Sequence, residues 1–224
     1  TFSIVACKGC GFEFTNPRLS QRALGEYDSR ESPYSGDEYH ALDEVRERYE
    51  QFLDSLAEAG VKGGSMLEIG CDKGQFLQIA QERGFDVHGI DPSDSADMAR
   101  EEFGLDVVRG LFDEVPYEDD SFDAIIMLDV LEHVSEPLQT LQKIQRILRP
   151  GGLFLVKVPN VRRERGLYPR IRTGALGYAA HEHLSHFSQH TLTDAFHRAG
   201  LEVALWRGFL PLDAGSGLRG ALFH

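Results

Sequence analysis

The stretch Ser65–Phe76, SMLEIGCDKGQF, decides the fold of this chain. Its first half is a short apolar run of the kind found in a strand that is covered on both faces of a parallel sheet. Gly70 and Gly74 then allow a tight turn and a close approach of the backbone to a ligand. The following residues predict a helix over Gln75–Arg83 that ends at Gly84. Strand, glycine turn and helix in this order build a nucleotide-type site at the carboxyl end of a strand.

Two acidic residues lie at the ends of the first two predicted strands. Glu68 interrupts the first apolar run, where a buried carboxylate is costly unless a partner meets it. The second strand, Phe85–Ile90, leads directly into Asp91, about twenty residues beyond the glycine turn, where such folds place a ribose-binding acid. The spacing Gly70-x-x-x-Gly74 is not the G-x-G-x-x-G pattern that holds a pyrophosphate. A cofactor with a ribose and no pyrophosphate therefore fits best.

Strands and helices alternate along most of the chain. This rhythm predicts an α/β fold with a doubly wound, mostly parallel sheet and helices on both faces. We expect residues 1–36 to form an irregular N-terminal segment and residues 37–224 to form the main domain, with an insert at about 159–187. The expected strands are 66–69, 86–90, 106–109, 122–128, 153–158 and 201–209, and the expected helices are 37–59, 75–83, 94–103, 137–148 and 188–199.

Charge and hydropathy exclude several classes of partner. The chain has 23 Lys and Arg against 36 Asp and Glu, which gives a formal net charge of −13. This balance argues against nucleic acid as the substrate, because phosphate contacts need clustered basic residues. No apolar run approaches the ~20 residues of a membrane span, and no signal peptide opens the chain. We therefore expect a cytoplasmic protein without a membrane anchor.

The three cysteines cannot form a disulfide framework. Cys71 lies inside the glycine turn, where we expect a packed thiol beside the cofactor. Cys7 and Cys10, in the sequence CKGCG, have the form of half a zinc knuckle, and a tetrahedral structural site needs four ligands. A second pair before Thr1 would be required to complete such a site. No metal is therefore predicted for this chain.

Several segments, in the same order along the chain, resemble the class I S-adenosylmethionine methyltransferases. Besides the glycine turn and Asp91, these are PYEDDSFD (116–123), LDVLEHV (128–134) and LRPGG (148–152). The resemblance covers roughly residues 61–203. It implies that S-adenosyl-L-methionine is the cofactor and S-adenosyl-L-homocysteine the product. It also implies a Rossmann-like sheet that finishes with an antiparallel strand, which residues 215–224 would supply.

The resemblance also implies a cofactor site. In it Glu68 supports the glycine loop and the methionine amino group, and Asp91 accepts the ribose hydroxyls. Leu111 stands where the family often has an acid that reads the adenine amino group, so the backbone or Asp113 is expected to do so. An ordinary turn at the glycines and a helix N-cap at Asp91 are the structural alternatives. The implied cofactor-binding residues are Glu68, Gly70, Cys71, Gly74, Asp91, Pro92, Leu111, Leu128 and Asp129.

Two segments carry candidate catalytic residues. His133 follows the fourth strand, beside the methyl group in similar proteins, and histidine is the side chain best matched to proton transfer near neutral pH; its alternative role is a structural hydrogen bond. His181–Ser188, HEHLSHFS, resembles the H-E-H-L-x-x-F-S segment of deoxysugar C-methyltransferases. That resemblance implies that Glu182 and His183 act as an acid/base pair. The histidine spacing differs from the metal-binding H-E-x-x-H motif.

The favoured function is transfer of a methyl group from S-adenosylmethionine to oxygen or carbon of a small-molecule acceptor. Five arginines within 162–172 suit phosphate and carboxylate groups and predict an anionic or sugar-linked acceptor, unless they form a solvated loop. The alternatives are a non-catalytic protein that binds S-adenosylmethionine or takes part in an assembly, and an NAD-linked oxidoreductase. The absent G-x-G-x-x-G argues against the oxidoreductase.

Overall fold

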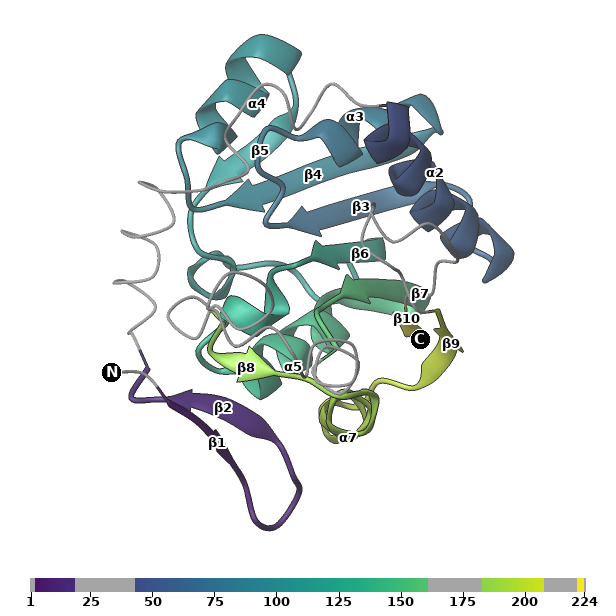
Figure 1. Cartoon of the computed structure of the whole chain (residues 1–224). Coiled ribbons are helices and arrows are strands. Elements are labelled where there is room, and N and C mark those ends of the chain that lie inside the picture. Colours follow the sequence, from purple (N-terminus) through teal and green to yellow (C-terminus); the bar gives the residue numbers. More distant parts are fainter. Residues whose placement is uncertain (1–2, 19–42, 161–182, 208–220, 224) are drawn as a thin grey trace.

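The computed structural model describes residues 3–18, 43–160, 183–207 and 221–223, and Figure 1 shows their arrangement. Its larger sheet has seven strands in the order β5-β4-β3-β6-β7-β10-β9. The pairs from β5 to β7 are parallel, whereas β10 is antiparallel to both of its neighbours. This is the mostly parallel sheet that the sequence predicts. The strands are β3 (Gly64–Ile69), β4 (Phe85–Asp91), β5 (Asp106–Arg109), β6 (Phe122–Leu128), β7 (Leu148–Lys157), β9 (Val203–Trp206) and β10 (Ala221–Phe223).

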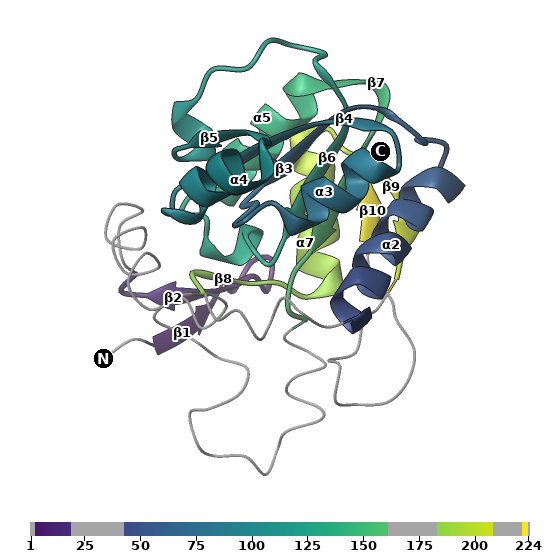
Figure 2. The ribbon, with the colours of Figure 1, turned by 90° about the horizontal axis from the view of Figure 1, so that it is seen from above.

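Helices cover both faces of this sheet, as Figure 2 shows for α3 and α5. Neighbouring residues of one strand enter different clusters, because side chains alternate across a sheet. Met66 packs in the cluster that contains residues of α2, α3 and α4, whereas Leu67 packs in the cluster of α5 and α7. The helices are α2 (Asp43–Glu58), α3 (Gln75–Glu82), α4 (Ser95–Phe103), α5 (Pro137–Ile147) and α7 (Gln189–Ala199), and short 3₁₀ turns form η1 (Phe112–Glu114) and η2 (Leu131–His133).

The predicted cap of α7 is confirmed in detail. The Thr191 backbone N–H donates to Ser188 Oγ, and the Ser188 N–H donates back to Thr191 Oγ1. This reciprocal pair satisfies two donors that a helix start would otherwise leave unpaired. Gly200, with φ of 84°, ends the helix in the left-handed conformation. The cap therefore fixes the position at which the preceding residues, which include His183, join α7.

The boundaries differ from expectation in β7. We predicted a turn at 148–152 and a strand from 153, whereas β7 begins at Leu148. Phe122 of β6 pairs with Leu148 and Ala124 pairs with Leu153, so the extra residues form a bulge that contains Gly151 with φ of 83°. The first part of the predicted entry helix (37–42) and the end of the predicted last strand (208–209) lie outside the described residues.

A second, three-stranded sheet joins the N-terminus to a distant part of the chain. It consists of β1 (Ser3–Ala6), β2 (Glu13–Asn16) and β8 (Ser185–His186) in that order. All its pairs are antiparallel, and Glu13 lies opposite His186. This regular hairpin occupies a segment that we predicted to be loop-rich. None of the helices in the described ranges is both long and apolar enough to cross a membrane.

Candidate cofactor and acceptor site

The glycine turn after β3 has the conformation that the sequence predicts. Gly70 and Gly74 have φ of 77° and 74°, in the left-handed region that glycine adopts at little cost. A Cβ on Gly70 would lie 2.3 Å from Val130 Cγ2, and one on Gly74 would lie 2.4 Å from Leu105 Cδ1. We expected these glycines to admit a ligand. In the described part of the chain they also admit close packing by neighbouring protein side chains.

Asp91 ties together the loops that follow β3 and β4. Its side chain is 8% exposed, and Oδ2 accepts from the Asp72 backbone N–H at 2.9 Å. Oδ1 accepts from the Ser93 N–H at 2.8 Å and from Ser93 Oγ at 2.5 Å. The N-cap of α4 is Asp94, so the alternative role of Asp91 as that cap does not hold. The carboxylate is held rigidly at the carboxyl ends of two adjacent parallel strands, where nucleotide-type ligands bind such sheets.

Glu68 is an acidic residue in the interior of the domain. It is 4% exposed, and its Oε2 atom accepts no hydrogen bond from the residues that the structure describes. Burial, together with the nearby carboxylates of Asp91 and Asp72, raises the pKa of Glu68 well above its ordinary value. An acceptor of this kind, beside the glycine turn, suits the positively charged methionine end of S-adenosylmethionine.

This pKa shift predicts that Glu68 costs stability at neutral pH. Because its folded-state pKa is raised, the folded chain holds a proton that the unfolded chain has already released, and stability falls as pH rises from about 4.5 through the folded-state pKa. We therefore expect Glu68→Gln to raise the free energy of unfolding by about 1–3 kcal/mol at pH 8, with a smaller gain at pH 5. Urea unfolding at both pH values measures this difference.

The matched control is Glu101→Gln, because Glu101 is an exposed acid on α4. That variant should match the unsubstituted chain at both pH values. A Glu68→Gln variant that is less stable than the parent at pH 8 would show that a cationic partner holds the carboxylate.

The adenine-side loop is fixed by contacts with α5. Thr140 Oγ1 donates to the Asp113 carboxylate at 3.2 Å. Lys143 Nζ donates to the carbonyls of Phe112 and Val115 and lies 4.4 Å from the centre of the Phe112 ring. Leu111 is half-buried in extended backbone just before η1. Asp113, which we expected to be able to read the adenine, is thus engaged by Thr140.

Cys71 is 4% exposed, which agrees with the predicted packed thiol. Burial raises its pKa, so the thiol is not a reactive nucleophile. At the N-terminal hairpin Cys7 is exposed, and hydrogen bonds from the backbone N–H groups of Cys10 and Gly9 lower the pKa of its thiol. That Cys7 and Cys10 alone bind no metal stays a prediction.

The end of β6 places a charged pair beside the glycine turn. Asp129 has φ of 55°, an uncommon conformation for a residue with a side chain, and its N–H donates to the Lys157 carbonyl at 2.9 Å. Lys157 Nζ also forms an ion pair with the Asp129 carboxylate. Sequence reasoning assigned Asp129 and Leu128 to the methionine side but missed Lys157. Its position at the carboxyl end of β7 was the signal that could have revealed it.

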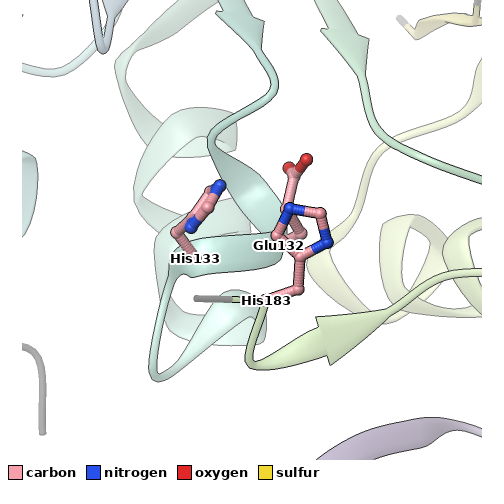
Figure 3. A group of neighbouring side chains, drawn as sticks. All are labelled: Glu132, His133 and His183. Atoms are coloured by element: carbon pink, nitrogen blue, oxygen red, sulfur yellow. The ribbon is translucent and has the colours of Figure 1, made fainter. Parts of the chain in front are cut away.

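Two of the predicted catalytic residues lie together. His133 ends η2, directly after β6, and its ring lies 4.9 Å from the His183 ring, centre to centre, in an edge-on arrangement. Figure 3 shows that both side chains, and that of Glu132, project to the same side of η2. Glu132 is 2% exposed. One possible ligand atom from each of the three lies within 4.8 Å of the others.

Backbone contacts hold this cluster from two directions. The Leu184 N–H donates to the Glu132 carbonyl at 2.8 Å, which fixes the start of β8 on η2. Thr15 Oγ1, on β2, donates to the His183 carbonyl at 2.8 Å and lies 3.1 Å from His186 Nε2. His183 and His133 are therefore positioned by elements far apart in sequence. Sequence reasoning missed Glu132, although its place beside His133 after a buried strand was a usable signal.

Two predicted features are not located. Glu182, the proposed partner of His183, lies outside the described residues, and so does the arginine-rich stretch 162–172.

Comparison with known proteins identifies the family. A family model for the methyltransferase domain matches residues 41–205, which include all of α2, every described element from β3 to α7, and β9 except its last residue. The chain belongs to the methyltransferase domain family. The mostly parallel sheet, the glycine turn and Asp91 are thus features of a methyltransferase domain, and its cofactor is S-adenosyl-L-methionine.

Two curated relatives match part of this methyltransferase domain. A "probable S-adenosylmethionine-dependent methyltransferase" of Mycolicibacterium smegmatis is 32% identical over 100 residues, which cover 44% of this chain and 39% of the relative. The ubiquinone biosynthesis O-methyltransferase of Alkalilimnicola ehrlichii is 32% identical over 117 residues, which cover 48% of this chain and 47% of the relative. The chain thus matches less than half the length of each relative.

A solved structure agrees with the fold of the methyltransferase domain. The PH0226 protein from Pyrococcus horikoshii has a TM-score of 0.67 and 21% sequence identity, and the match covers 89% of this chain and 98% of that one. At this identity the likeness concerns the fold alone. The near-complete coverage means that the sheet and its helices are shared over most of the domain.

The described residues fit S-adenosyl-L-methionine. Glu68 presents a buried oxygen that accepts no hydrogen bond from them, and Asp91 presents a fixed carboxylate at the neighbouring strand end. The glycine turn follows Glu68 directly, and its left-handed backbone carries no side chain at Gly70 or Gly74. Glu68, Gly70, Cys71, Gly74, Asp91, Pro92, Leu111, Leu128 and Asp129 remain the proposed cofactor-binding residues.

Proposed function

We propose that this chain transfers the methyl group of S-adenosylmethionine to an oxygen or carbon atom of a small-molecule acceptor. The observation that carries the proposal is the shared location of two sets of residues. Glu68 and Asp91 lie at the carboxyl ends of β3 and β4, and the His133–His183 cluster follows the carboxyl end of the adjacent β6. Parallel strands bring these ends to one edge of the sheet, and this edge is where we propose that the cofactor and the acceptor meet.

The chemistry asks the chain to align and deprotonate the acceptor. S-adenosylmethionine supplies a methyl group on a positively charged sulfur, which keeps the electron pair of the broken S–C bond as the new C–O or C–C bond forms. His133 and His183, with Glu182, are proposed to contact the acceptor and to accept its proton. Alignment and proton transfer are the two contributions that such a reaction needs from the protein.

The class of acceptor is inferred from several observations. The likeness to a ubiquinone biosynthesis O-methyltransferase supports an oxygen acceptor, whereas the HEHLSHFS segment resembles that of enzymes that methylate carbon next to a carbonyl. The five arginines within 162–172, which lie outside the described residues, suit phosphate and carboxylate groups and favour an anionic or sugar-linked acceptor. The net charge of −13 supports a small molecule in place of nucleic acid.

Calorimetric titration of the purified chain with S-adenosylhomocysteine tests the cofactor part of this proposal, with NADH as the parallel control. We expect binding of S-adenosylhomocysteine alone, with a dissociation constant on the order of 1–100 μM. Binding of NADH alone would overturn the proposal.

A screen with methyl-labelled S-adenosylmethionine then tests catalysis, with phenols and anionic sugars as the first acceptors. Incorporation of label into a small acceptor supports the proposal. Binding of S-adenosylhomocysteine without labelling of any acceptor would favour the non-catalytic alternative.

A further inference from the structure

The cluster of Glu132, His133 and His183 combines the ligand types of a metal site. Two imidazoles and one carboxylate form the protein ligand set of several catalytic zinc centres, which keep their remaining coordination position open for water or substrate. The sequence did not predict this combination, because Glu132 and His133 are separated from His183 by about fifty positions. η2 and the start of β8 bring the three together (Figure 3).

We propose that Glu132, His133 and His183 bind one divalent transition-metal ion, such as Zn²⁺ or Co²⁺. Imidazole nitrogen and carboxylate oxygen together suit these ions, whereas Mg²⁺ and Ca²⁺ favour oxygen ligands alone. The burial of Glu132, at 2% exposure, favours an arrangement in which the carboxylate faces a cation. The formal net charge of the chain, −13, also favours the binding of a cation.

The geometry requires only a small closure of the cluster. Atoms that bind one zinc ion tetrahedrally at about 2.0–2.2 Å lie about 3.3–3.6 Å apart. The three candidate atoms lie within 4.8 Å of one another. Separations of up to 4.8 Å therefore have to shorten by about 1–1.5 Å, which rotation of the side chains can supply. No change in the backbone of η2 or β8 is needed.

The backbone around the cluster is already fixed, as a metal site requires. Thr15 Oγ1 holds the His183 carbonyl, and the Leu184 N–H holds the Glu132 carbonyl. These contacts hold the backbone of two of the three ligand residues, so that only side-chain movement is needed to bind an ion. In this proposal the small sheet of β1, β2 and β8 has a structural role, because it fixes His183 relative to Glu132 and His133.

A bound ion would define the acceptor more narrowly. This consequence rests on the proposed methyltransferase function. A metal ion stabilises an oxygen anion at its open position. The favoured acceptors are therefore phenols and enols, which bind through their hydroxyl oxygen. With the ion bound, the two imidazoles are ligands in place of proton acceptors, and the proton of the acceptor hydroxyl passes to solvent.

Titration with Co²⁺, followed by its visible absorption, tests metal binding directly. The experiment uses a Cys7→Ser/Cys10→Ser background, because the exposed thiol pair could bind the same ion. We expect one equivalent of Co²⁺ and at least about a tenfold loss of affinity in His133→Ala and in His183→Ala. His190→Ala is the matched control, because His190 is an exposed histidine of α7, and it should leave Co²⁺ affinity unchanged.

Two results would overturn the metal proposal. The first is the absence of binding at about 100 μM Co²⁺, and the second is binding that is equally strong in His183→Ala. Titration of the same samples with S-adenosylhomocysteine separates this failure from that of the proposed function. A chain that binds S-adenosylhomocysteine without Co²⁺ retains the methyltransferase proposal and loses only the metal. Co²⁺ binding that depends on both histidines supports the metal site whatever the cofactor result.

Discussion

The Asp91→Ala variant is expected to bind S-adenosylhomocysteine about 100-fold more weakly than the parent chain, or not detectably. A hydrogen bond to a charged group contributes about 1.5–3 kcal/mol, and the carboxylate is proposed to accept both ribose hydroxyls, so a loss of about 3 kcal/mol or more is expected. The same carboxylate also fixes the Asp72 and Ser93 backbone N–H groups, which shape the wall of the site. Calorimetric titration measures the change.

Asp94→Ala is the control for this experiment. Asp94 lies three residues further on, is largely exposed and pairs with Arg109 on the surface. Its replacement removes the same charge without removing a contact to the proposed ribose site, so the affinity should stay within about twofold, as expected for an exposed ion pair. If Asp91→Ala folds normally by circular dichroism and binds as tightly as the parent, the ribose is held elsewhere and our assignment of Asp91 is wrong.

The sheet could be predicted from the sequence because its signals are local. The strand before Gly70, the turn and the helix after it lie within a few residues of one another, and each has its own pattern of apolar residues or caps. Ser188 and Gly200 likewise mark the ends of α7 by their own chemistry. The Asp91 position followed from the same local order, since a parallel strand ends where its apolar run ends.

The acceptor side could not be predicted in the same way. The pairing of β2 with β8 brings Thr15 against His183, although 168 positions separate them. No pattern in either segment predicts this pairing, because almost any two extended segments can form the backbone hydrogen bonds of an antiparallel pair. Glu132 was overlooked for a related reason. Glu132 becomes a candidate site residue only because the fold brings His183 next to it. An acidic residue that precedes a histidine in sequence does not by itself predict a site.

The His183→Ala variant should lower the rate of methyl transfer by about 10²–10⁴-fold, measured with labelled S-adenosylmethionine and an acceptor found in the screen. The fold should survive, because Thr15 binds the backbone carbonyl of His183 and the Leu184 N–H binds the Glu132 carbonyl, and neither contact uses the imidazole. Affinity for S-adenosylhomocysteine should also be unchanged, since Glu68 and Asp91 carry the proposed cofactor contacts.

His190→Ala controls for the loss of a histidine from the same part of the chain and should keep the full rate. Comparing kcat with KM then separates two roles for His183. A fall in kcat with an unchanged KM indicates a contribution made in the transition state, whereas a rise in KM alone indicates that the side chain only holds the acceptor. A His183→Ala chain with the parent rate would exclude both roles, and catalysis would have to be assigned to other residues of the acceptor side.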